Sequence, residues 1–134
     1  NHLGNMFGGK LMSLMDGIAG ITASKFSEKT VVTYSSEAIE FRNPVNVGDR
    51  LHLIADIIFT NRAVIVIRVD VYAENKGENN RSYCTTGFFN MVLADSEKYF
   101  SSFARLIIET EDEKRDFQTG KEVWETAMER KRKR

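Results

Sequence analysis

The residues most able to do chemistry lie close to the start of the chain, in the stretch NHLGNMFGGKLMSLMDG. Two glycines, Gly8 and Gly9, open an apolar periodic segment, and Asp16 follows them among methionines and leucines. The first N–H groups of a helix lack internal acceptors and carry the positive end of its dipole, and glycine lets a carbonyl group come close to them. Such a helix start can stabilise the oxyanion formed on a thioester or ester carbonyl. Asn5 could orient a carbonyl or a water molecule, and Asp16 could act as general base or nucleophile.

A simpler interpretation of the same residues stays open. Gly8 and Gly9 could serve close packing alone, and Asp16 could be a solvated residue on an amphipathic helix. Asp16 would also lie about 10 Å along the helix axis from Gly9, at about 1.5 Å per residue. If the site exists, Asp16 therefore serves the helix start of a second copy, which predicts a dimer with shared sites.

The remaining reactive side chains fit other catalytic devices poorly. His2 and His52 are the only histidines; His2 lies at the chain start, and His52 lies in a strand pattern as an ordinary sheet-face residue. No G-x-S-x-G elbow is present. Cys84, the single cysteine, is expected to be a small core residue rather than a nucleophile. No Cys/His cluster has metal-ligand spacing and no phosphate-binding glycine motif occurs, so we expect no metal.

Composition excludes further function classes. The chain has 134 residues, of which 42% are hydrophobic and 28% charged, as in one ordinary globular domain with a core. Lys+Arg and Asp+Glu each number 19, which gives no electrostatic case for binding nucleic acid. No apolar run approaches the roughly 20 residues of a membrane span, and no signal peptide is visible. We therefore expect a cytoplasmic protein with no nucleic-acid or membrane partner.

A helix followed by a sheet must position these residues. The segment 8–26 has helical periodicity, with an apolar face on one side and small residues around Asp16 on the other; the apolar face holds Leu11, Leu14, Met15, Ile18 and Ala19. Strand-like segments follow at 31–41, 51–59, 63–72 and 82–94, with a turn signal at 46–49. One helix before antiparallel strands predicts α+β architecture rather than βαβ.

Two further patterns bear on the layers of the fold. Residues 63–72 alternate strictly, with Val64, Val66, Arg68, Asp70 and Tyr72 on one face and Ile65, Ile67, Val69 and Val71 on the other. From Thr110 onward the chain is a charged helix, in which Thr110 and Glu113 form a plausible capping box and Gly120 is a possible interruption. This helix is expected to lie on the surface or to cover a sheet edge.

The first stretch also resembles the signature of hotdog-fold acyl-CoA thioesterases, in the acyl-CoA hydrolase branch. That signature, N-x-x-G-x-x-F-G-G and then M-D or M-E, matches residues 1–9 and Met15-Asp16. Residues 41–49, FRNPVNVGD, resemble the F-x-x-P-x-x-x-G-D segment of the family. Asn61-Arg62 is similar to its G-R-x-S/T turn, with Asn61 in place of glycine, and residues 109–114 resemble its acidic stretch, with Ile108 where proline is usual.

The resemblance implies a fold and an assembly. It implies one hotdog domain over residues 1–134, with a core over 1–109 and a charged helical extension over 110–134. An antiparallel sheet would wrap around one long central helix, and two copies would pair into a dimer with one continuous sheet, further assembled as a trimer of dimers. It also implies a strand before Asn1.

The resemblance also implies an activity, namely hydrolysis of fatty or short acyl-CoA to free CoA and a carboxylic acid, with no cofactor besides the CoA thioester substrate. Asp16 matches the catalytic carboxylate and Asn5 the polar partner from the facing subunit. Gly8 and Gly9 match the helix start that meets the thioester carbonyl. Independently of the resemblance, Met12, Met15 and Phe7 suggest an apolar lining of the pocket, although the same residues would also serve as plain core. Arg62 is a candidate for the CoA phosphates.

Two other functions of the same fold stay open. A non-catalytic module could bind or sense acyl-CoA in the same pocket, although no helix-turn-helix extension is visible in the sequence. A hydratase would need a histidine paired with the aspartate, and His2 and His52 are poorly placed for that. Release of free thiol from acyl-CoA separates hydrolysis from binding.

Overall fold

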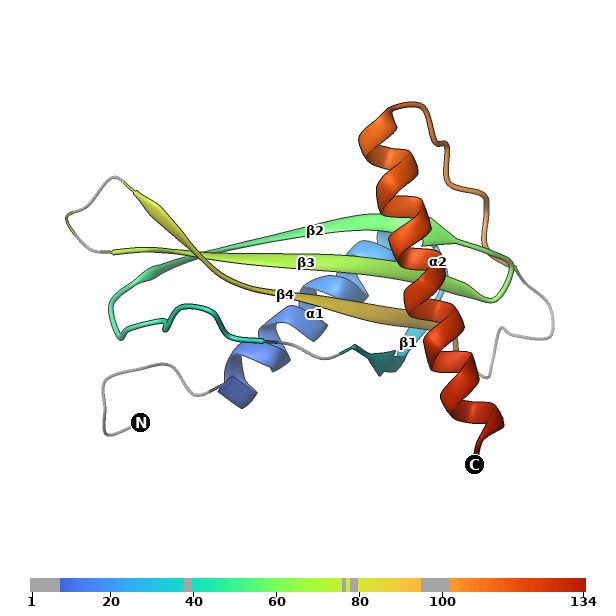
Figure 1. The fold of residues 1–134 in the computed structure, drawn as a ribbon, viewed down its shortest axis with the longest axis horizontal. Helices are drawn as coiled ribbons and strands as arrows, with labels where there is room; N and C mark the ends of the chain where they lie inside the picture. Colours follow the sequence, from blue (N-terminus) through green and yellow to red (C-terminus); the bar gives the residue numbers. More distant parts are fainter. Residues whose placement is uncertain (1–7, 38–39, 76, 78–79, 95–101) are drawn as a thin grey trace.

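The architecture is known from a computed structural model, which describes residues 8–37, 40–75, 77, 80–94 and 102–134. Its elements are, in order, α1 (Gly8–Ser27), β1 (Val31–Ser36), β2 (Arg50–Thr60), β3 (Val64–Glu74), β4 (Arg81–Leu93) and α2 (Glu111–Arg132) (Figure 1). The predicted α+β order is confirmed. The strand predicted over residues 31–41 is shorter in the structure, where β1 ends at Ser36. No helix in the described part of the chain has the length and apolarity to cross a bilayer.

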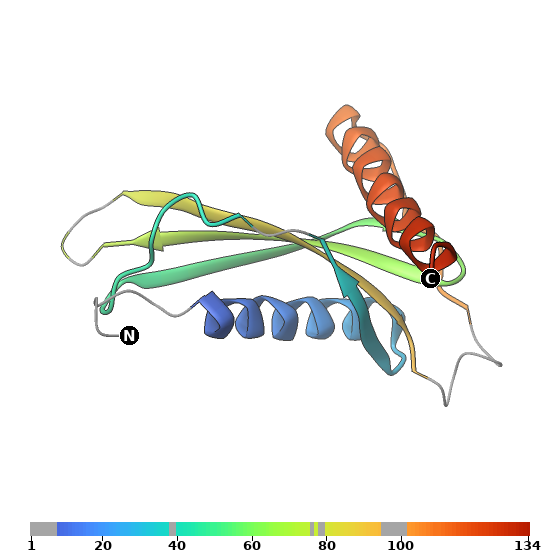
Figure 2. The same cartoon turned by 60° about the horizontal axis from the view of Figure 1, so that its bottom comes forward.

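The four strands form one antiparallel sheet in the order β1-β4-β3-β2. Helix α1 lies against one face of this sheet and α2 against the other (Figure 2). The alternation predicted for 63–72 is confirmed, since Ile65, Ile67, Val69 and Val71 pack with α1, whereas Val64 and Val66 pack with α2. A strand covered on both faces can be apolar on both faces, as β3 is from Val64 to Ile67.

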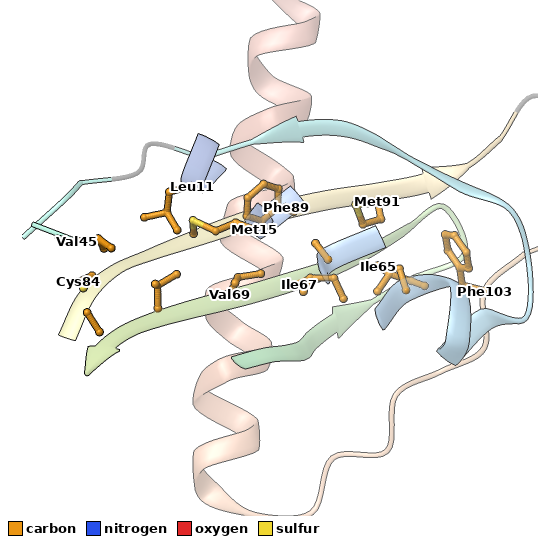
Figure 3. Packing of buried hydrophobic residues seen from close by; sticks show 14 of the residues in the cluster. Leu11, Met15, Val45, Ile65, Ile67, Val69, Cys84, Phe89, Met91 and Phe103 are labelled. Carbon is orange, nitrogen blue, oxygen red and sulfur yellow. The ribbon is translucent and has the colours of Figure 1, made fainter. Parts of the chain in front are cut away.

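The larger core lies between α1 and the sheet (Figure 3). Leu11, Met15 and Ala19 recur every four residues on α1 and are at most 2% exposed, so one stripe of the helix faces the sheet. Leu14, predicted for the same face, is 43% exposed. The buried stripe is narrower than predicted because the sheet in this chain covers one side of α1.

Helix α2 begins with the predicted capping box. The Thr110 hydroxyl accepts a hydrogen bond from the Glu113 N–H at 3.0 Å, and the Glu113 carboxylate accepts one from the Thr110 N–H at 2.8 Å. Acidic residues occupy the first turn and basic residues the last turn, an order that complements the helix dipole. The basic end of the chain is thus mostly the last turn of a helix.

The expectation that Gly120 could interrupt this helix is wrong, since α2 is continuous through it. Gly120 is buried where α2 crosses β2: a Cβ added there would lie 2.5 Å from the Phe59 Cβ and 3.0 Å from the Ile58 Cγ1. One turn earlier, the Phe117 ring packs on the Phe59 ring with centroids 4.8 Å apart. The glycine therefore lets the helix backbone approach the strand.

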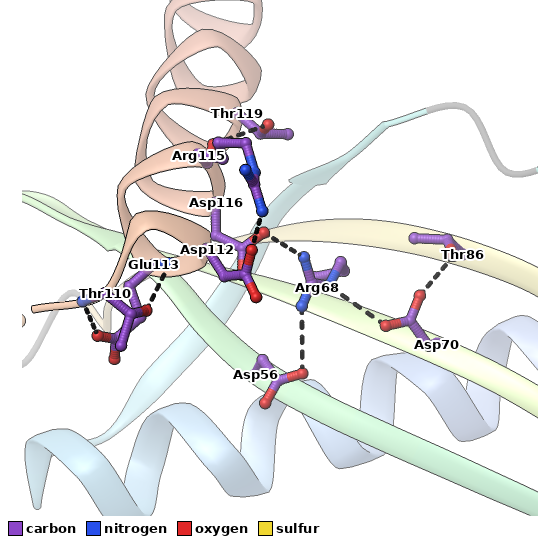
Figure 4. A network of polar contacts seen from close by, with 10 residues as sticks. All are labelled: Asp56, Arg68, Asp70, Thr86, Thr110, Asp112, Glu113, Arg115, Asp116 and Thr119. Atoms are coloured by element: carbon purple, nitrogen blue, oxygen red, sulfur yellow. Dashed lines mark hydrogen bonds and ion pairs between the residues drawn. The ribbon is translucent and has the colours of Figure 1, made fainter. Parts of the chain in front are cut away.

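Charged contacts join α2 to the sheet beside this packing (Figure 4). Arg68 of β3 lies 2.6 Å from Asp116 of α2, 3.2 Å from Asp70 of β3 and 3.4 Å from Asp56 of β2. The Asp70 carboxylate also accepts a hydrogen bond from the Thr86 hydroxyl at 2.5 Å. One guanidinium thus holds three carboxylates that would otherwise repel one another.

Candidate active site

Asp16 lies at the edge of α1 that faces β1. It follows the buried Met15, and a step of about 100° along the helix turns its side chain from the core toward the border of the sheet. There the Thr33 hydroxyl donates a 2.6 Å hydrogen bond to Asp16 Oδ1. Thr33 Oγ1 is also 3.4 Å from the Met91 sulfur on β4. The contact fixes one oxygen of the carboxylate, and both residues are exposed.

A groove runs from this pair along the border between α1 and the sheet. It has a volume of about 680 Å³, within the usual range of small-molecule sites. Asp16 and Lys25 are its charged residues, about 13 Å apart along the helix at about 1.5 Å per residue. The rest is apolar or small: Gly17, Gly20, Ile21, Ser24, Val31, Val32, Thr33 and Met91. A carboxylate beside an apolar channel can activate water next to an acyl chain.

Of the small residues beside Asp16 on α1, Gly17 borders open space, whereas Gly20 lies against β4. A Cβ added at Gly17 would meet nothing within 4 Å, and one at Gly20 would meet the Met91 Cε at 3.8 Å.

Within the residues that the structure describes, no group of His, Cys, Asp or Glu side chains is arranged to hold a metal ion.

The other predicted site residues are distributed as follows. Asn5 and Phe7 lie outside the described residues. Gly8 and Gly9 are the first residues of α1, and Gly8 lies beneath the Phe41 ring, which would be 3.5 Å from an added Cβ. No acidic side chain occupies the first turn of α1. Because α1 is one unbroken helix, Asp16 is two turns from Gly8 in the same chain.

Two predicted substrate-binding residues are placed by the structure. Met12 is 38% exposed on α1, one turn before Asp16 and on the same side of the helix. Arg62 is exposed in the turn between β2 and β3, and its carbonyl accepts a hydrogen bond from the Phe103 N–H. Arg62 is not among the described residues that line the groove. Within one chain, the structure brings together Asp16 and Thr33, but not Asp16 and Arg62.

Sequence reasoning missed Thr33, although it found Asp16. Thr33 belongs to the strand-like run VVTYSS, where alternation places it on the same face as Val31. That pattern gives the face of the sheet but not the neighbour, which belongs to the preceding helix.

Neither His52 nor Cys84 lines the groove. His52 Nε2 is 2.9 Å from the Glu74 carboxylate on the neighbouring strand, and the pKa of Glu74 is lowered mainly by this hydrogen bond. Cys84 is a free, buried thiol, and burial raises its pKa. Both agree with the roles expected for them.

Comparison with known proteins places this geometry in a family. The profile of the thioesterase superfamily matches residues 3–79. An uncharacterized acyl-CoA thioester hydrolase of Zymomonas mobilis is 34% identical over 73% of this chain and 66% of its own length. The cytosolic acyl coenzyme A thioester hydrolase of Mus musculus is 33% identical over 88% of this chain and 32% of its length. The chain thus spans about two thirds of the first relative and about a third of the second.

Solved structures of acyl-CoA thioesterases are also similar to this chain. A hexameric acyl-CoA thioesterase superposes with a TM-score of 0.86 at 33% identity, over 97% of this chain and 83% of that one. An acyl-CoA hydrolase of Staphylococcus aureus, solved with butyryl coenzyme A, coenzyme A and coenzyme A disulfide, superposes with a TM-score of 0.87 at 27% identity, over 99% and 81%.

Variants of the Staphylococcus aureus hydrolase have also been solved. In them an asparagine, an aspartate or a threonine is replaced by alanine. The sheet of four antiparallel strands around α1 has the hotdog fold of these thioesterases. This chain belongs to the thioesterase superfamily.

Proposed function

We propose that this chain hydrolyses the thioester of acyl-CoA to free CoA and a carboxylic acid. The observation that carries the proposal is the Asp16 carboxylate, held on one oxygen by Thr33 at the end of a largely apolar groove. The names of the relatives support the substrate class. The acyl chain, fatty or short, would lie in the groove.

The proposed step uses Asp16 as general base. Asp16 takes a proton from a water molecule whose oxygen bonds to the carbonyl carbon, and the carbonyl electron pair moves onto its oxygen. When the carbonyl re-forms, the C–S bond breaks and the CoA sulfur takes the proton from Asp16. The hydrogen bond from Thr33 occupies Oδ1 and leaves Oδ2 to accept from water. In the alternative, Asp16 attacks the carbonyl carbon itself and the C–S bond breaks, which releases CoA thiolate and leaves an anhydride. Water then hydrolyses the anhydride to the carboxylic acid and the Asp16 carboxylate, and the thiolate takes up the proton released.

The oxyanion is proposed to form against the helix start of a second copy. Helix amides at Gly8 and Gly9 are too far from Asp16 of the same helix, so the complete site needs at least a homodimer. A trimer of dimers is proposed because one similar thioesterase is hexameric. In this assembly Phe7 and Met12 would contact the acyl chain, and Arg62 would contact the CoA phosphates. No cofactor is needed for this step.

Spacing adds two residues to the proposal. The asparagine, aspartate and threonine replaced in the Staphylococcus aureus hydrolase follow one another in the same order and at the same intervals as Asn1, Asp16 and Thr33 in this chain. We therefore propose Thr33 as the residue that orients Asp16. Asn1 joins Asn5 as a candidate for the polar partner.

The first experiment measures free thiol released from a series of acyl-CoAs that runs from acetyl-CoA to palmitoyl-CoA. Asp16→Asn keeps the shape of the side chain but removes the base, so kcat should fall by about 10²- to 10⁴-fold while the oligomer persists. Asp112→Asn, on the far face in α2, is the matched control and should keep the wild-type rate. Asn1→Ala and Asn5→Ala, compared side by side, identify which asparagine contributes.

Three outcomes separate the alternatives. Wild-type rates from Asp16→Asn would remove Asp16 from the mechanism. Tight acyl-CoA binding without thiol release would support a sensing module instead of an enzyme. Single-turnover hydrolysis in ¹⁸O-water should label the released acid; label on Asp16 would require the nucleophilic route.

A further inference from the structure

The edge strand β1 contains an irregularity beside the proposed active site. Thr33 pairs with Met91 and Ser35 pairs with Asn90, so Tyr34 is an extra residue opposite the same two positions of β4. A bulge of this kind changes the direction of the side chains that follow it and is common next to active sites. Here it sits one residue after the threonine that bonds to Asp16.

Side chains on either side of the bulge point to opposite faces of the sheet. Thr33 faces α1, where it meets Asp16 and Met91. Ser35 instead accepts a 2.9 Å hydrogen bond from Asn90, whose neighbours on β4, Phe88 and Val92, pack with α2. In a regular strand Thr33 and Ser35 would share a face; the bulge places Ser35 with Tyr34 on the α2 side.

Helix α2 makes two contacts on that side, one with Tyr34 of β1 and one with Glu37, the residue that follows the strand. The Trp124 ring meets the Tyr34 ring edge-on, with centroids 5.8 Å apart. The Arg130 guanidinium binds both carboxylate oxygens of Glu37, at 2.7 and 3.2 Å. The two contacts lie at and just after the bulge. Figure 1 shows the C-terminal half of α2 crossing β4 toward β1.

Besides the contacts with α2, the described contacts of β1 are its pairing with β4 and its packing against α1. It has six residues and pairs with β4 alone among the strands described, and Val32 and Tyr34 are 48% and 42% exposed. At the bulge the ladder with β4 is locally interrupted, so side-chain contacts help to define the geometry there. A bidentate arginine–carboxylate pair and an aromatic edge contact each add direction as well as energy.

We propose that Trp124 and Arg130 are positioning residues for catalysis: by holding the Tyr34 bulge from the outer face, they aim the Thr33 hydroxyl at Asp16 on the inner face. The inference rests on the proposed function, because it needs a reaction that depends on Asp16. It assigns α2 a part in the active site although α2 lies on the opposite side of the sheet.

The test compares substitutions along α2 by their effect on kcat and KM. Trp124→Leu should lower kcat about tenfold or more, since misplacement of a catalytic group by about 1 Å can cost a hundredfold, and should leave KM nearly unchanged. Trp124→Phe keeps an aromatic edge and should restore most of kcat. Phe117→Leu is the matched control: it removes an aromatic contact of α2 with β2, on Phe59, and should keep kcat.

The ion pair is tested by exchange. Arg130→Glu and Glu37→Arg should each lower kcat, and the double exchange should recover it. The single variants exclude a general effect of surface charge, because Arg130→Glu makes the net charge more negative and Glu37→Arg makes it more positive, yet both should lower kcat.

A double-mutant cycle decides whether these residues act through Thr33. Thr33→Val removes the hydroxyl, so Trp124→Leu should have little further effect on kcat in that background. Additive losses, an unchanged kcat in Trp124→Leu, or an equal loss in Phe117→Leu would each overturn the inference. Absence of thiol release from the wild type would overturn the proposed function instead, so the two failures are distinct.

Discussion

Gly120 offers a direct test of how α2 is seated on the sheet. On helix propensity alone, Gly120→Ala should stabilise the protein by about 1 kcal/mol, because glycine is the worse helix former by that amount. The structure predicts the opposite sign. The new Cβ would lie 2.5 Å from the Phe59 Cβ, an atom fixed to the β2 backbone that cannot rotate away.

The magnitude follows from two opposing terms. Overpacking a filled contact costs about 1–3 kcal/mol, and the 2.5 Å approach is far inside ordinary contact, so the cost should be near the upper end. Subtracting the gain in helix propensity of about 1 kcal/mol leaves a net loss of about 1–2 kcal/mol. Gly120→Leu cannot be seated without moving the helix and should lose more.

The assay is urea unfolding at one fixed protein concentration, because dissociation of an oligomer makes the midpoint depend on concentration. Thr119→Ala is the control: Thr119 is the exposed neighbour on the same helix and should change stability by no more than about 0.7 kcal/mol. If Gly120→Ala were as stable as the wild type or more stable, α2 would not lie against Ile58 and Phe59, and the seating of the helix described above would be wrong.

Three further outcomes are expected. Thr110→Ala should lower the free energy of unfolding in urea by about 1 kcal/mol. The N–H groups of Thr110 and Glu109 hold the pKa of Glu113 below its usual value, so the Glu113 carboxylate stabilises the protein above the usual carboxyl pKa, and this effect is lost as pH falls through the lowered pKa. Urea unfolding of the wild type and of Glu113→Gln across that pH range measures the effect. Burial that raises the pKa of Cys84 should hide the thiol, so titration with a disulfide reagent should find none in the native protein and one per chain in denaturant. Arg68→Met should lower the free energy of unfolding in urea by about 1–3 kcal/mol at neutral pH, a loss kept moderate because the Arg68 side chain is a quarter exposed.

The local structure of this chain follows closely from its sequence. Helix α1 is predicted by the four-residue spacing of Leu11, Met15 and Ala19, which are buried, because a 3.6-residue period tells which side of a helix must leave water. The two faces of β3 likewise follow from strict alternation. The capping box at Thr110 is a contact between near neighbours in the chain, short enough to be recognised in sequence.

Motif and chemistry together also single out one residue of the candidate site. Asp16 stands out as a carboxylate among apolar neighbours, and the structure places it in a groove. Its partner Thr33 does not stand out, because a strand threonine has no feature that distinguishes a catalytic neighbour from a solvated hydroxyl. The roles of Asn5 and Arg62 stay predictions.

Only the tertiary structure decided the contacts between distant segments. From the sequence, Gly120 suggests a break in the helix. Only the crossing of α2 over β2 shows that this glycine lets the helix backbone approach the strand. The bulge at Tyr34 depends on pairing with β4, in the second half of the chain, and on contacts with Trp124 and Arg130 near its far end. Periodicity reports which side of an element is buried; which residue it then meets depends on how the chain folds back, and that is a property of the whole structure.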